Sequence, residues 1–429
     1  MEPIDLGPFP FAAGYETAAA LDAADPLREF AQRFVPAEPG LIYLDGNSLG
    51  RLPSATVSHI RDVVDHEWGE RIIRSWPERW WDLADEIGSG IAGLVGAEPT
   101  EVIVADSTSV ALFKLTVAAL QARAGRTRIV TDDLNFPTDA YATAAAANLV
   151  GGIEIVTVPS ADGVYGPVDD IIEALDHDTA LLTLSHVVFK SGFLYDMARL
   201  TRAAHDAGAL VLWDLSHSVG AVPVDLDATG ADLAVGCTYK YLNGGPGSPA
   251  FLYVNTGIDA EIDNPLSGWW GHENPFAFDL TYAPAPSIRR FQTGTMPILS
   301  LAGIETGVAL TTEAGIENLR VKSVGLSEFF IQQSRASLEP LGFRIASPLH
   351  AAERGSHVSL RKPDGWRIVR AMVEHAKIIP DFREPDNIRF GFAPLYTSYT
   401  DVHTAVARIV ELMTAGFHLG YDQQRGSVT

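Results

Sequence analysis

Residues 210–217 read Leu-Val-Leu-Trp-Asp-Leu-Ser-His, and this stretch decides the fold of the chain. Its successive apolar residues predict a strand that is buried on both faces, and Asp214 ends the run. Strands of this kind belong to parallel sheets that helices cover on both sides. A carboxylate at the end of such a strand is costly unless it meets a cation. The stretch therefore predicts an α/β fold with a functional acid, or a cap or turn residue, at the edge of the sheet.

The segments on either side repeat this pattern. Short apolar, β-branched runs predict further strands at Val102–Ala105, Arg128–Thr131, Ile153–Val158, Ala180–His186 and Ala250–Val254. Residues Val110–Ala122 and Met197–Ala207 carry helix-spaced apolar side chains between these runs. The alternation predicts a mostly parallel sheet between helices, in which ligands bind beyond the carboxyl ends of the strands.

The pattern changes after Pro297. Long amphipathic helices follow, then two candidate strands near Phe343–Ala346 and His357–Leu360, and a closing helix from Asp401. A smaller C-terminal α+β domain is the expected result. For 429 residues, a length of about 100–200 residues per domain suggests two or three domains. We expect an N-terminal segment at 1–59 that packs with the small domain, a large α/β domain at 60–305 and the small domain at 306–429.

Charge and cysteine content exclude several classes of protein. Lys and Arg number 31 against 54 Asp and Glu, and the net charge of −23 repels nucleic acid and anionic lipid surfaces. The single cysteine, Cys237, rules out an intrachain disulfide framework and a multi-cysteine metal site, which suits a reducing cytoplasm. No stretch approaches the ~20 apolar residues of a membrane span. We predict a soluble cytoplasmic protein with no metal, nucleic acid or membrane as partner.

Lys240 is the second informative residue. The chain has only six lysines, and this one lies in the segment Thr238-Tyr-Lys-Tyr-Leu-Asn-Gly244, among aromatic residues and before glycines. A lysine that attacks a carbonyl must be a neutral amine, which burial favours. The alternative is a surface lysine before a loop. Together with Asp214 and His217, the lysine indicates pyridoxal 5′-phosphate (PLP), whose pyridine nitrogen stays protonated when it is paired with an acid.

A phosphate site is expected at Ser107, Thr108 and Ser109. These residues lie between a predicted strand and a predicted helix, where free N–H groups and hydroxyls bind anions. The same residues also suit an ordinary helix N-cap.

Residues 135–139 follow the next strand and read Asn-Phe-Pro-Thr-Asp. Phe136 is a candidate to stack on the cofactor ring, and Asp139 a candidate to add negative charge near the ring nitrogen. A Phe-Pro turn that serves only packing is the alternative.

Together these motifs resemble the kynureninase family, whose members are fold-type I PLP enzymes. The resemblance runs from about Tyr43 to the closing helix. It rests on Gly46-Asn47-Ser48-Leu49-Gly50, Phe136-Pro-Thr138-Asp139, Asp214-x-x-His217, Tyr239-Lys240-Tyr-Leu-Asn243, Ser267-Gly-Trp-Trp-Gly-His272 and Ala393-Pro-Leu-Tyr396. The lysine segment alone also fits cysteine desulfurase-like lyases, whereas the Gly-Asn-Ser-Leu-Gly and Gly-Trp-Trp-Gly-His motifs are more specific.

The resemblance implies a role for each matching residue. Lys240 binds PLP covalently and moves protons at the substrate α-carbon, while Asp214 pairs with the ring nitrogen. The other implied cofactor positions are Ser107, Thr108, Phe136, Thr138, Asp139, Ser185, His217, Tyr239, Trp269 and Thr295. Thr295 matches a position supplied by a neighbouring subunit, which implies a homodimer with shared active sites. The implied substrate positions are Asn47, Ser48, Trp76, Gly294 and Arg389, where the Arg389 fork suits an α-carboxylate.

The implied reaction is hydrolysis of L-kynurenine to anthranilate and L-alanine, in tryptophan degradation or secondary metabolism. Tyr239 is either the acid–base at the γ-carbonyl or a phosphate ligand only. Gly294-Thr295 and Trp76 favour L-kynurenine over 3-hydroxykynurenine. The chain departs from the family at His186-Val-Val-Phe189, where an Asn-Tyr pair is common and a polar contact is therefore expected to be missing.

Three other functions compete with this interpretation. A cysteine desulfurase-like lyase or an epimerase shares the lysine segment, but Cys237 lies three residues before Lys240 and not on a mobile loop. A PLP-binding regulatory protein would not need the full set of Asp, Lys and Arg. A nucleotide-binding protein would need a Walker or G-x-G-x-x-G motif after a strand.

Overall fold

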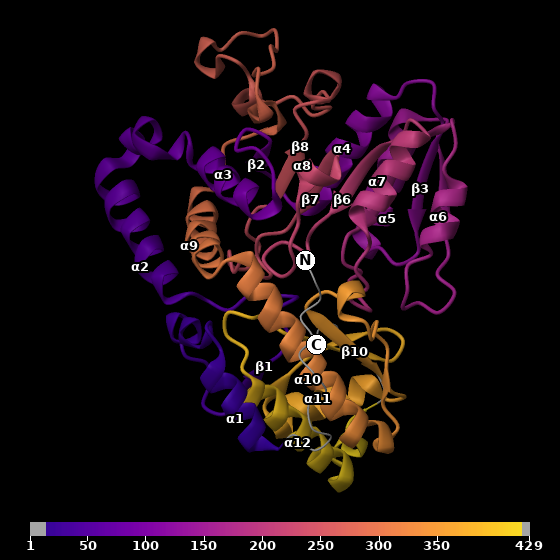
Figure 1. Ribbon diagram of the computed structural model, residues 1–429. Helices are drawn as coiled ribbons and strands as arrows, with labels where there is room; N and C mark the ends of the chain where they lie inside the picture. Colours follow the sequence, from indigo (N-terminus) through magenta and orange to yellow (C-terminus); the bar gives the residue numbers. More distant parts are fainter. Residues whose placement is uncertain (1–13, 423–429) are drawn as a thin grey trace.

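A computed structural model describes residues 14–422, which form two parts stacked one above the other (Figure 1). The larger part is built on a seven-stranded sheet with the strand order β2-β8-β7-β6-β5-β3-β4. Its strands are β2 (Val102–Val104), β3 (Arg128–Asp132), β4 (Glu154–Val158), β5 (Thr179–Ser185), β6 (Leu210–Asp214), β7 (Leu233–Gly236) and β8 (Phe251–Val254). Strand β8 runs antiparallel to both of its neighbours, β2 and β7, and the other pairs in the sheet are parallel. The prediction of a mostly parallel sheet is confirmed.

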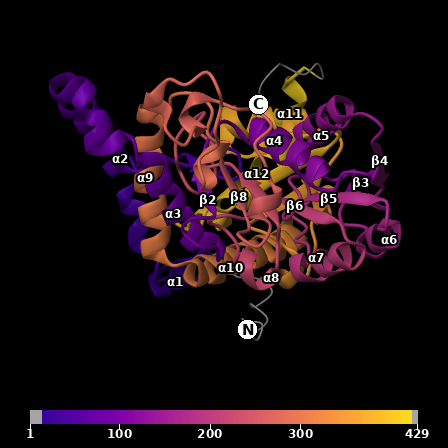
Figure 2. The same cartoon turned by 90° about the horizontal axis from the view of Figure 1, so that it is seen from above.

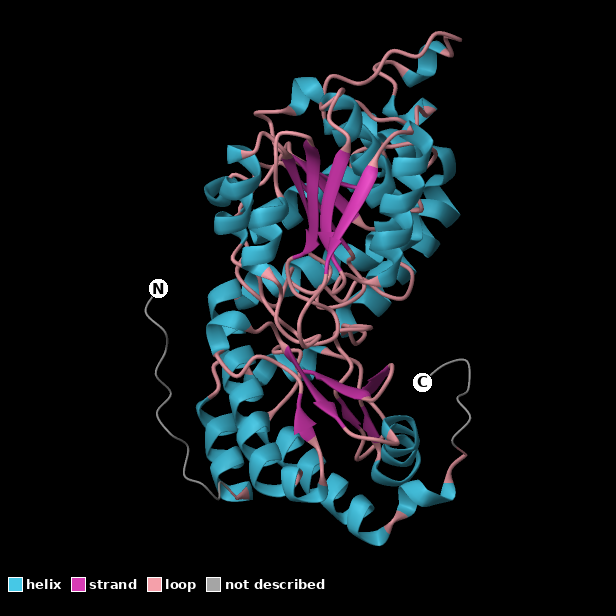
Figure 3. Cartoon of the chain, turned by 90° about the vertical axis from the view of Figure 1, so that its right-hand side faces the viewer, coloured by secondary structure: helices cyan, strands magenta, loops and turns pink. Residues whose placement is uncertain are grey.

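Helices flank this sheet on both faces, as Figure 3 shows in side view. They are α3 (Leu83–Val95), α4 (Thr108–Ala122), α5 (Pro137–Val150), α6 (Val168–Ala174), α7 (Met197–Asp206) and α8 (Leu226–Thr229). Because both faces are covered, every residue of β5 and β6 is buried. The apolar runs in the sequence follow from this burial. Strand β7 was not predicted, because two of its four residues are alanine and glycine, which are depleted in strands.

The smaller part is a four-stranded antiparallel sheet, in the order β12-β13-β10-β9, packed against helices. Its elements are β9 (Arg344–Ile345), β10 (His357–Arg361), β12 (Asp381–Arg383), β13 (Asn387–Gly391), α10 (Ile316–Ser337), α11 (Gly365–Ala376) and α12 (Tyr399–Ala415). Helix α12 begins with a capping box, in which Ser398 and Asp401 exchange hydrogen bonds with each other's backbone. A separate apolar core, which includes Phe329, Phe330 and Phe390, joins sheet and helices. This is the smaller C-terminal α+β unit that was expected.

The described N-terminal residues pack on the smaller part. Helix α1 (Tyr15–Ala24) contacts α12, and β1 (Ile42–Tyr43) pairs in parallel with β11 (Ile378–Ile379). The Asp22 carboxylate accepts a hydrogen bond of 2.7 Å from the backbone N–H of Tyr399.

The expected domain limits at residues 59 and 305 fall inside α2 (Ser54–Asp62) and α9 (Ile298–Ala314), two helices that pack together. The division into three parts stays a prediction. Residues 1–13 and 423–429, which belong to the first and last expected parts, lie outside the described residues.

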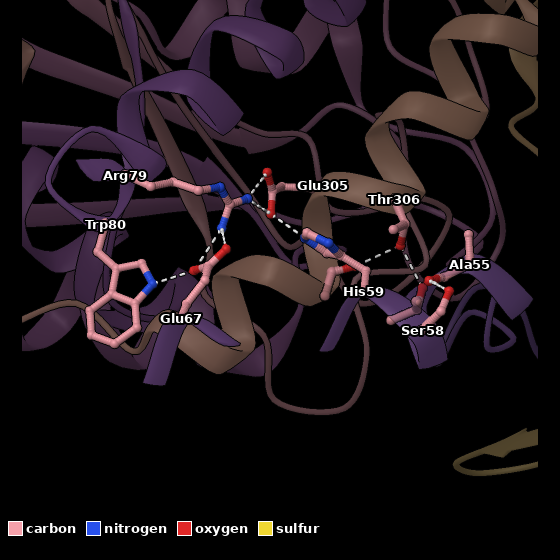
Figure 4. Close-up of polar contacts among 10 residues, drawn as sticks. Ala55, Ser58, His59, Glu67, Arg79, Trp80, Glu305 and Thr306 are labelled. Carbon is pink, nitrogen blue, oxygen red and sulfur yellow. Dashed lines mark hydrogen bonds and ion pairs between the residues drawn. The ribbon is translucent and has the colours of Figure 1, made fainter. Parts of the chain in front are cut away.

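Helix α2 continues into an arm that extends beyond the rest of the molecule (Figure 2). The arm contains η2 (Val63–Arg71), η3 (Ile72–Arg74) and η4 (Trp76–Trp80). A polar network ties it to α9, with Arg79 between two glutamates (Figure 4). Arg79 Nη1 lies 3.0 Å from Glu67 and Nη2 lies 2.5 Å from Glu305, and His59 Nε2 lies 2.7 Å from Glu305.

Short helical turns complete the chain between the longer elements. They are η1 (Arg28–Arg33), η5 (Asp259–Glu261), η6 (Trp269–Gly271), η7 (Pro275–Ala277), η8 (Ile288–Phe291), η9 (Glu339–Leu341), η10 (Ala351–Glu353) and η11 (Phe417–Gly420). None of the helices within residues 14–422 is long and apolar enough to cross a membrane.

Candidate active site

A cavity of about 200 Å³ lies where the carboxyl ends of the large sheet meet the smaller part. It is lined by Asn47, Ser48, Thr108, Ser109, Phe136, Thr138, Asp139, Asp214, Ser216, His217, Tyr239, Lys240, Arg383 and Arg389. These residues come from the N-terminal segment, from the loops after β2, β3, β6 and β7, and from β12 and β13. The cavity therefore occupies the position expected for ligands of an open α/β sheet.

Lys240 faces His217 across this cavity. The lysine Nζ lies 2.9 Å from His217 Nε2. Burial, and next the positive charge of Lys240, lower the pKa of His217 well below its usual range. The imidazole is therefore neutral, and its Nε2 accepts a hydrogen bond from the lysine. The uncharged His217 therefore holds the Lys240 amine by a hydrogen bond and forms no ion pair with it.

The Gly46–Gly50 motif packs directly on the lysine loop. The backbone N–H of Gly50 donates to the carbonyl of Tyr239 at 2.8 Å, and a side chain at position 50 would collide with the Lys240 carbonyl. Glycine is required there because two backbone segments approach each other. The motif therefore helps to fix the position of the lysine.

Two buried carboxylates, Asp139 and Asp214, lie beside the lysine. Asp214 accepts a hydrogen bond of 2.8 Å from the Ser216 N–H, and Asp139 accepts one of 3.3 Å from the Ser185 hydroxyl. Within residues 14–422, neither forms an ion pair with a basic side chain. Burial, and next the charge of Asp214, raise the pKa of Asp139 well above its ordinary value. A protonated pyridine nitrogen would supply the missing cation, so this acid pair fits PLP.

The N-terminus of α4 suits the cofactor phosphate. Thr108 and Ser109 line the cavity in the first turn of the helix, where backbone N–H groups are free. The preceding Asp106 has a φ of +52°, and this turn is held by the fully buried Lys114, whose Nζ lies 2.8 Å from Asp106 Oδ2. Lys114 also donates to the Phe291 carbonyl. Sequence reasoning missed this support, because Lys114 lies inside an ordinary apolar helix.

Phe136 is placed to cover a ring in the cavity. It is the N-cap residue of α5 and is 42% exposed, while its neighbour Thr138 lies in the first turn of the helix. The Phe136 ring meets Phe189 edge to face, with centroids 5.2 Å apart. One face of Phe136 is therefore left for a planar ligand.

Arg389 marks the opposite end of the cavity and is 1% exposed. Its Nη2 donates to the Ser48 hydroxyl at 2.9 Å and pairs with Asp381, and its Nη1 donates to the Phe189 carbonyl at 2.5 Å. The Asn47 amide oxygen accepts from Arg389 Nε at 2.7 Å. These bonds hold the guanidinium fork in one orientation, as recognition of a carboxylate requires.

A second arginine, Arg383, lines the same end, with Nη2 2.8 Å from Asp381 Oδ2. Ser109, which was expected at the phosphate site, lines the cavity as well. Arg383 and Ser216 also line it but were not predicted as site residues. Arg383 could be found only from the pairing of β12 with β13.

Six of the predicted site residues do not line the cavity of the single chain. Ser107 is the exposed N-cap of α4, and Ser185 lies behind Asp139. Trp76 packs against Trp80 and Trp270. The other three lie on exposed segments: Trp269 in η6, and Gly294 and Thr295 before α9. Their roles stay predictions.

The segment at 186–189 contributes backbone rather than side-chain contacts. His186 is buried against Trp213, and burial lowers the pKa of His186 to about 4. The Phe189 carbonyl binds Arg389. The segment therefore supports the carboxylate end without the polar side chains that are common in the resembled family.

The fold and this set of donors define a fold-type I PLP enzyme of the class-V aminotransferase group. The model described as "Aminotransferase class-V" matches residues 42–361. Solved structures agree in fold: a cysteine desulfurase from Thermococcus onnurineus has a TM-score of 0.77 at 18% identity, covering 90% of this chain and 98% of its own. A cysteine desulfurase from Escherichia coli has a TM-score of 0.77 at 17% identity, covering 91% and 98%.

Within that class, the chain belongs to the kynureninase family. The model described as "Kynureninase C-terminal domain" matches residues 319–409. A kynureninase of Pseudomonas fluorescens is 43% identical over 92% of this chain and 94% of its own length. One of Burkholderia mallei is 42% identical over 93% and 95%.

The alternative of a desulfurase-like lyase is not supported, although the fold is shared. The sequence relatives are kynureninases, and the desulfurase structures are similar only at the level of fold. Cys237 is buried, and burial raises the pKa of its thiol. A protonated, inaccessible thiol is a poor nucleophile.

Proposed function

We propose that this enzyme hydrolyses L-kynurenine to anthranilate and L-alanine. The observation that supports the proposal best is the placement of Lys240 beside a neutral histidine, with Arg389 at the other end of the same cavity. An amino acid carries an amine and a carboxylate a short distance apart, and this cavity presents one partner for each.

The chain's residues would divide the work as follows. Arg389 binds the α-carboxylate, and the Lys240 amine takes and returns the proton of the α-carbon. Asp214 and Asp139 keep the bound ring charged, while Thr108, Ser109 and Tyr239 hold the phosphate. Bound PLP supplies a pyridinium ring that stores the electron pair released at the α-carbon.

Tyr239 is the candidate proton donor at the γ-carbonyl. Burial raises the pKa of Tyr239 above its usual range, so the phenol carries its proton at neutral pH. We expect Tyr239→Phe to slow carbon–carbon cleavage by roughly 10²-fold while α-proton exchange into deuterated water continues. Equal loss of both rates would leave the tyrosine as a phosphate ligand only.

We further propose a homodimer with shared active sites. Trp269 and Thr295 are exposed in the single chain, although the resemblance places both at the cofactor. The loop between them exposes Phe276, Phe278 and Leu280 at 61%, 76% and 102%. An apolar loop of this kind suits a second copy of the chain. Leu280→Asp should shift the mass in light scattering from dimer to monomer, and an unchanged mass would exclude this loop from the interface.

The preferred substrate is L-kynurenine, whose aromatic ring has no 3-hydroxyl group. Gly294-Thr295 and Trp76 support this choice by resemblance. The direct test is to add L-kynurenine to the purified enzyme and follow anthranilate fluorescence, with 3-hydroxykynurenine compared by kcat/KM. A protein with covalently bound cofactor that releases no anthranilate would refute the proposed function. A larger kcat/KM for the hydroxylated substrate would refute only the choice of ring.

A cytoplasmic location and a place in tryptophan degradation are proposed on the basis of the family resemblance.

A further inference from the structure

Residues 107–109, here called the phosphate turn, carry the free N–H groups at the start of α4 and follow directly after Asp106. Asp106 has a φ of +52°, a left-handed conformation that a residue with a side chain keeps only when its surroundings hold it. Its carbonyl accepts from the Ala250 N–H at 3.0 Å, which fixes the backbone beside β8. The direction of the phosphate turn therefore depends on what binds Asp106.

Both carboxylate oxygens of Asp106 bind side chains that do not line the cavity. Oδ1 accepts from the Thr293 hydroxyl at 3.2 Å, and Oδ2 lies 2.8 Å from the Nζ of Lys114. Lys114 is fully buried and also donates to the Phe291 carbonyl. Two side chains thus tie Asp106 to one segment, residues 291–293, which lies far along the chain.

The same segment holds a further turn in place. The Trp270 N–H donates to the Thr293 carbonyl at 3.2 Å, and a side chain at Gly268 would collide with that carbonyl. Because Gly268 has no side chain, the turn that contains Trp269 packs directly on Thr293. Thr293 therefore joins this turn and the residues that follow it, Gly294 and Thr295, to the phosphate turn.

Charge gives a second reason for this arrangement. The Asp106 carboxylate lies one residue before the phosphate turn, where an unbalanced negative charge would weaken the binding of a phosphate. The ammonium group of Lys114 offsets this charge from a position that water does not reach. The hydrogen bond from Thr293 holds the other oxygen, so the carboxylate stays in the ion pair.

We propose that Asp106 is a positioning residue for the cofactor phosphate and that Thr293 acts through it: together they set the direction of the free N–H groups of the phosphate turn from a segment outside the cavity. Neither side chain touches the ligand. The inference rests on the proposed function only in that Thr108 and Ser109 hold the phosphate. It does not depend on the amino-acid substrate.

The test separates the phosphate from the rest of the cofactor. Cofactor-free protein is titrated in phosphate-free buffer with PLP and with pyridoxal, which lacks the phosphate. The two dissociation constants are obtained from the absorbance of the covalent adduct with Lys240. Their ratio measures the preference for the phosphate-bearing ligand. A residue with a general structural role would weaken both ligands equally and leave this ratio unchanged.

The informative variants are at Thr293. Thr293→Val removes the hydroxyl and keeps the shape of the side chain, whereas Thr293→Ser keeps the hydroxyl. We expect Thr293→Val to lower the preference for PLP by roughly tenfold, because a hydrogen bond to a charged group has an effect of this order. Thr293→Ser should retain the natural preference. Asp106→Asn tolerates the left-handed conformation but breaks the ion pair with Lys114, so its preference should fall further.

The matched control is Lys322→Met. It breaks another buried ion pair between a lysine and an aspartate, in which Lys322 Nζ lies 2.7 Å from Asp25, and neither residue lines the cavity. This variant should unfold at a lower urea concentration and keep the natural preference for PLP. An unchanged preference in Thr293→Val would overturn the inference, as would an equal loss in Thr293→Ser. If Asp106→Asn does not fold, the two Thr293 variants decide the outcome, since they leave the buried ion pair intact.

Kynurenine hydrolysis is measured separately on the natural chain. A natural chain that releases no anthranilate, combined with a lowered preference for PLP in Thr293→Val, would keep the inference and refute the proposed function. Anthranilate release by the natural chain, combined with an unchanged preference in Thr293→Val, would overturn the inference and leave the proposed function in place.

Discussion

Two groups of charged side chains in this molecule differ in how their charges are matched. In the network between the arm and α9, Arg79 lies between Glu67 and Glu305, and His59 also binds Glu305 (Figure 4). In the cavity, Asp139 and Asp214 are buried side by side, and no basic side chain of residues 14–422 forms an ion pair with either. In the first group each glutamate has a basic partner among the described residues, whereas in the second group neither aspartate has one.

The difference separates a structural network from a binding site. Partly exposed ions that find partners within the chain can hold two helices together at little cost. Buried carboxylates without a cation destabilise the folded chain, and this cost is offset when a cationic ligand binds. Incomplete charge balance in a cavity is therefore a physical sign of a ligand, while a complete network is a sign of structure. The following predictions test this distinction.

The largest effect is expected at Lys240. Lys240→Ala should lower anthranilate release by on the order of 10³-fold or more, because both the covalent bond to the cofactor and the proton carrier are lost. The measurement is steady-state fluorescence, together with borohydride reduction and peptide mapping. Lys362→Ala, which removes a lysine that binds the Leu341 carbonyl and lies over the Phe343 ring, is the control and should stay active. A pyridoxyl adduct on a lysine other than Lys240 would contradict the assignment.

Arg389→Lys should have the next largest effect. A lysine cannot reproduce the two parallel bonds of the guanidinium fork, so kcat/KM should fall by on the order of 10²-fold, mainly through KM. Arg383→Lys, the matched change at the neighbouring arginine, should cost less because Arg383 is more exposed. A larger loss for Arg383→Lys would mean that the substrate carboxylate binds there instead.

The complete network should affect stability rather than chemistry. Arg79→Ala leaves Glu67 and Glu305 without their shared cation, and the free energy of unfolding should fall by about 1–3 kcal/mol, with kcat of the folded enzyme little changed. Urea titration measures the first quantity and initial rates the second. Arg71→Ala, which breaks an exposed pair with Glu78, should have little effect on either. If Arg79→Ala lowers kcat but leaves stability unchanged, the network serves catalysis and is not structural.

The smallest effect is a pH dependence at Asp139. Because the folded-state pKa of Asp139 is raised, the folded chain holds a proton that the unfolded chain has released. This group's contribution to stability is therefore present at acidic pH and is lost as pH rises from the ordinary carboxyl pKa toward the raised value. Asp139→Asn should raise the unfolding temperature of the cofactor-free protein more at pH 8 than at pH 5. An equal change at both pH values would show that the carboxyl is not destabilised by burial.

The sequence predicted the elements whose pattern is local. The apolar run that ends at Asp214 indicated the buried parallel strand, and glycines and tyrosines around Lys240 indicated a buried amine. Motif resemblance added Arg389, since an arginine on a strand is otherwise an ordinary surface residue. All three line the same cavity.

Other parts of the site depend on segments that are distant in the sequence. Ser48, Asp381 and Arg389 meet only because β12 pairs with β13 and the N-terminal segment lies along β13. Lys114 supports the phosphate turn through Asp106 and the distant carbonyl of Phe291. No local pattern encodes such contacts, because side-chain periodicity reports which face is buried and not which residue lies opposite.

By itself, the amino-acid order determined the class of fold and the lysine, acid and arginine of the site, because apolar periodicity and short motifs are properties of neighbouring residues. Only the tertiary structure decided which charges are balanced and which are left for a ligand. Charge balance depends on distance and burial, and both are set when separate segments pack together.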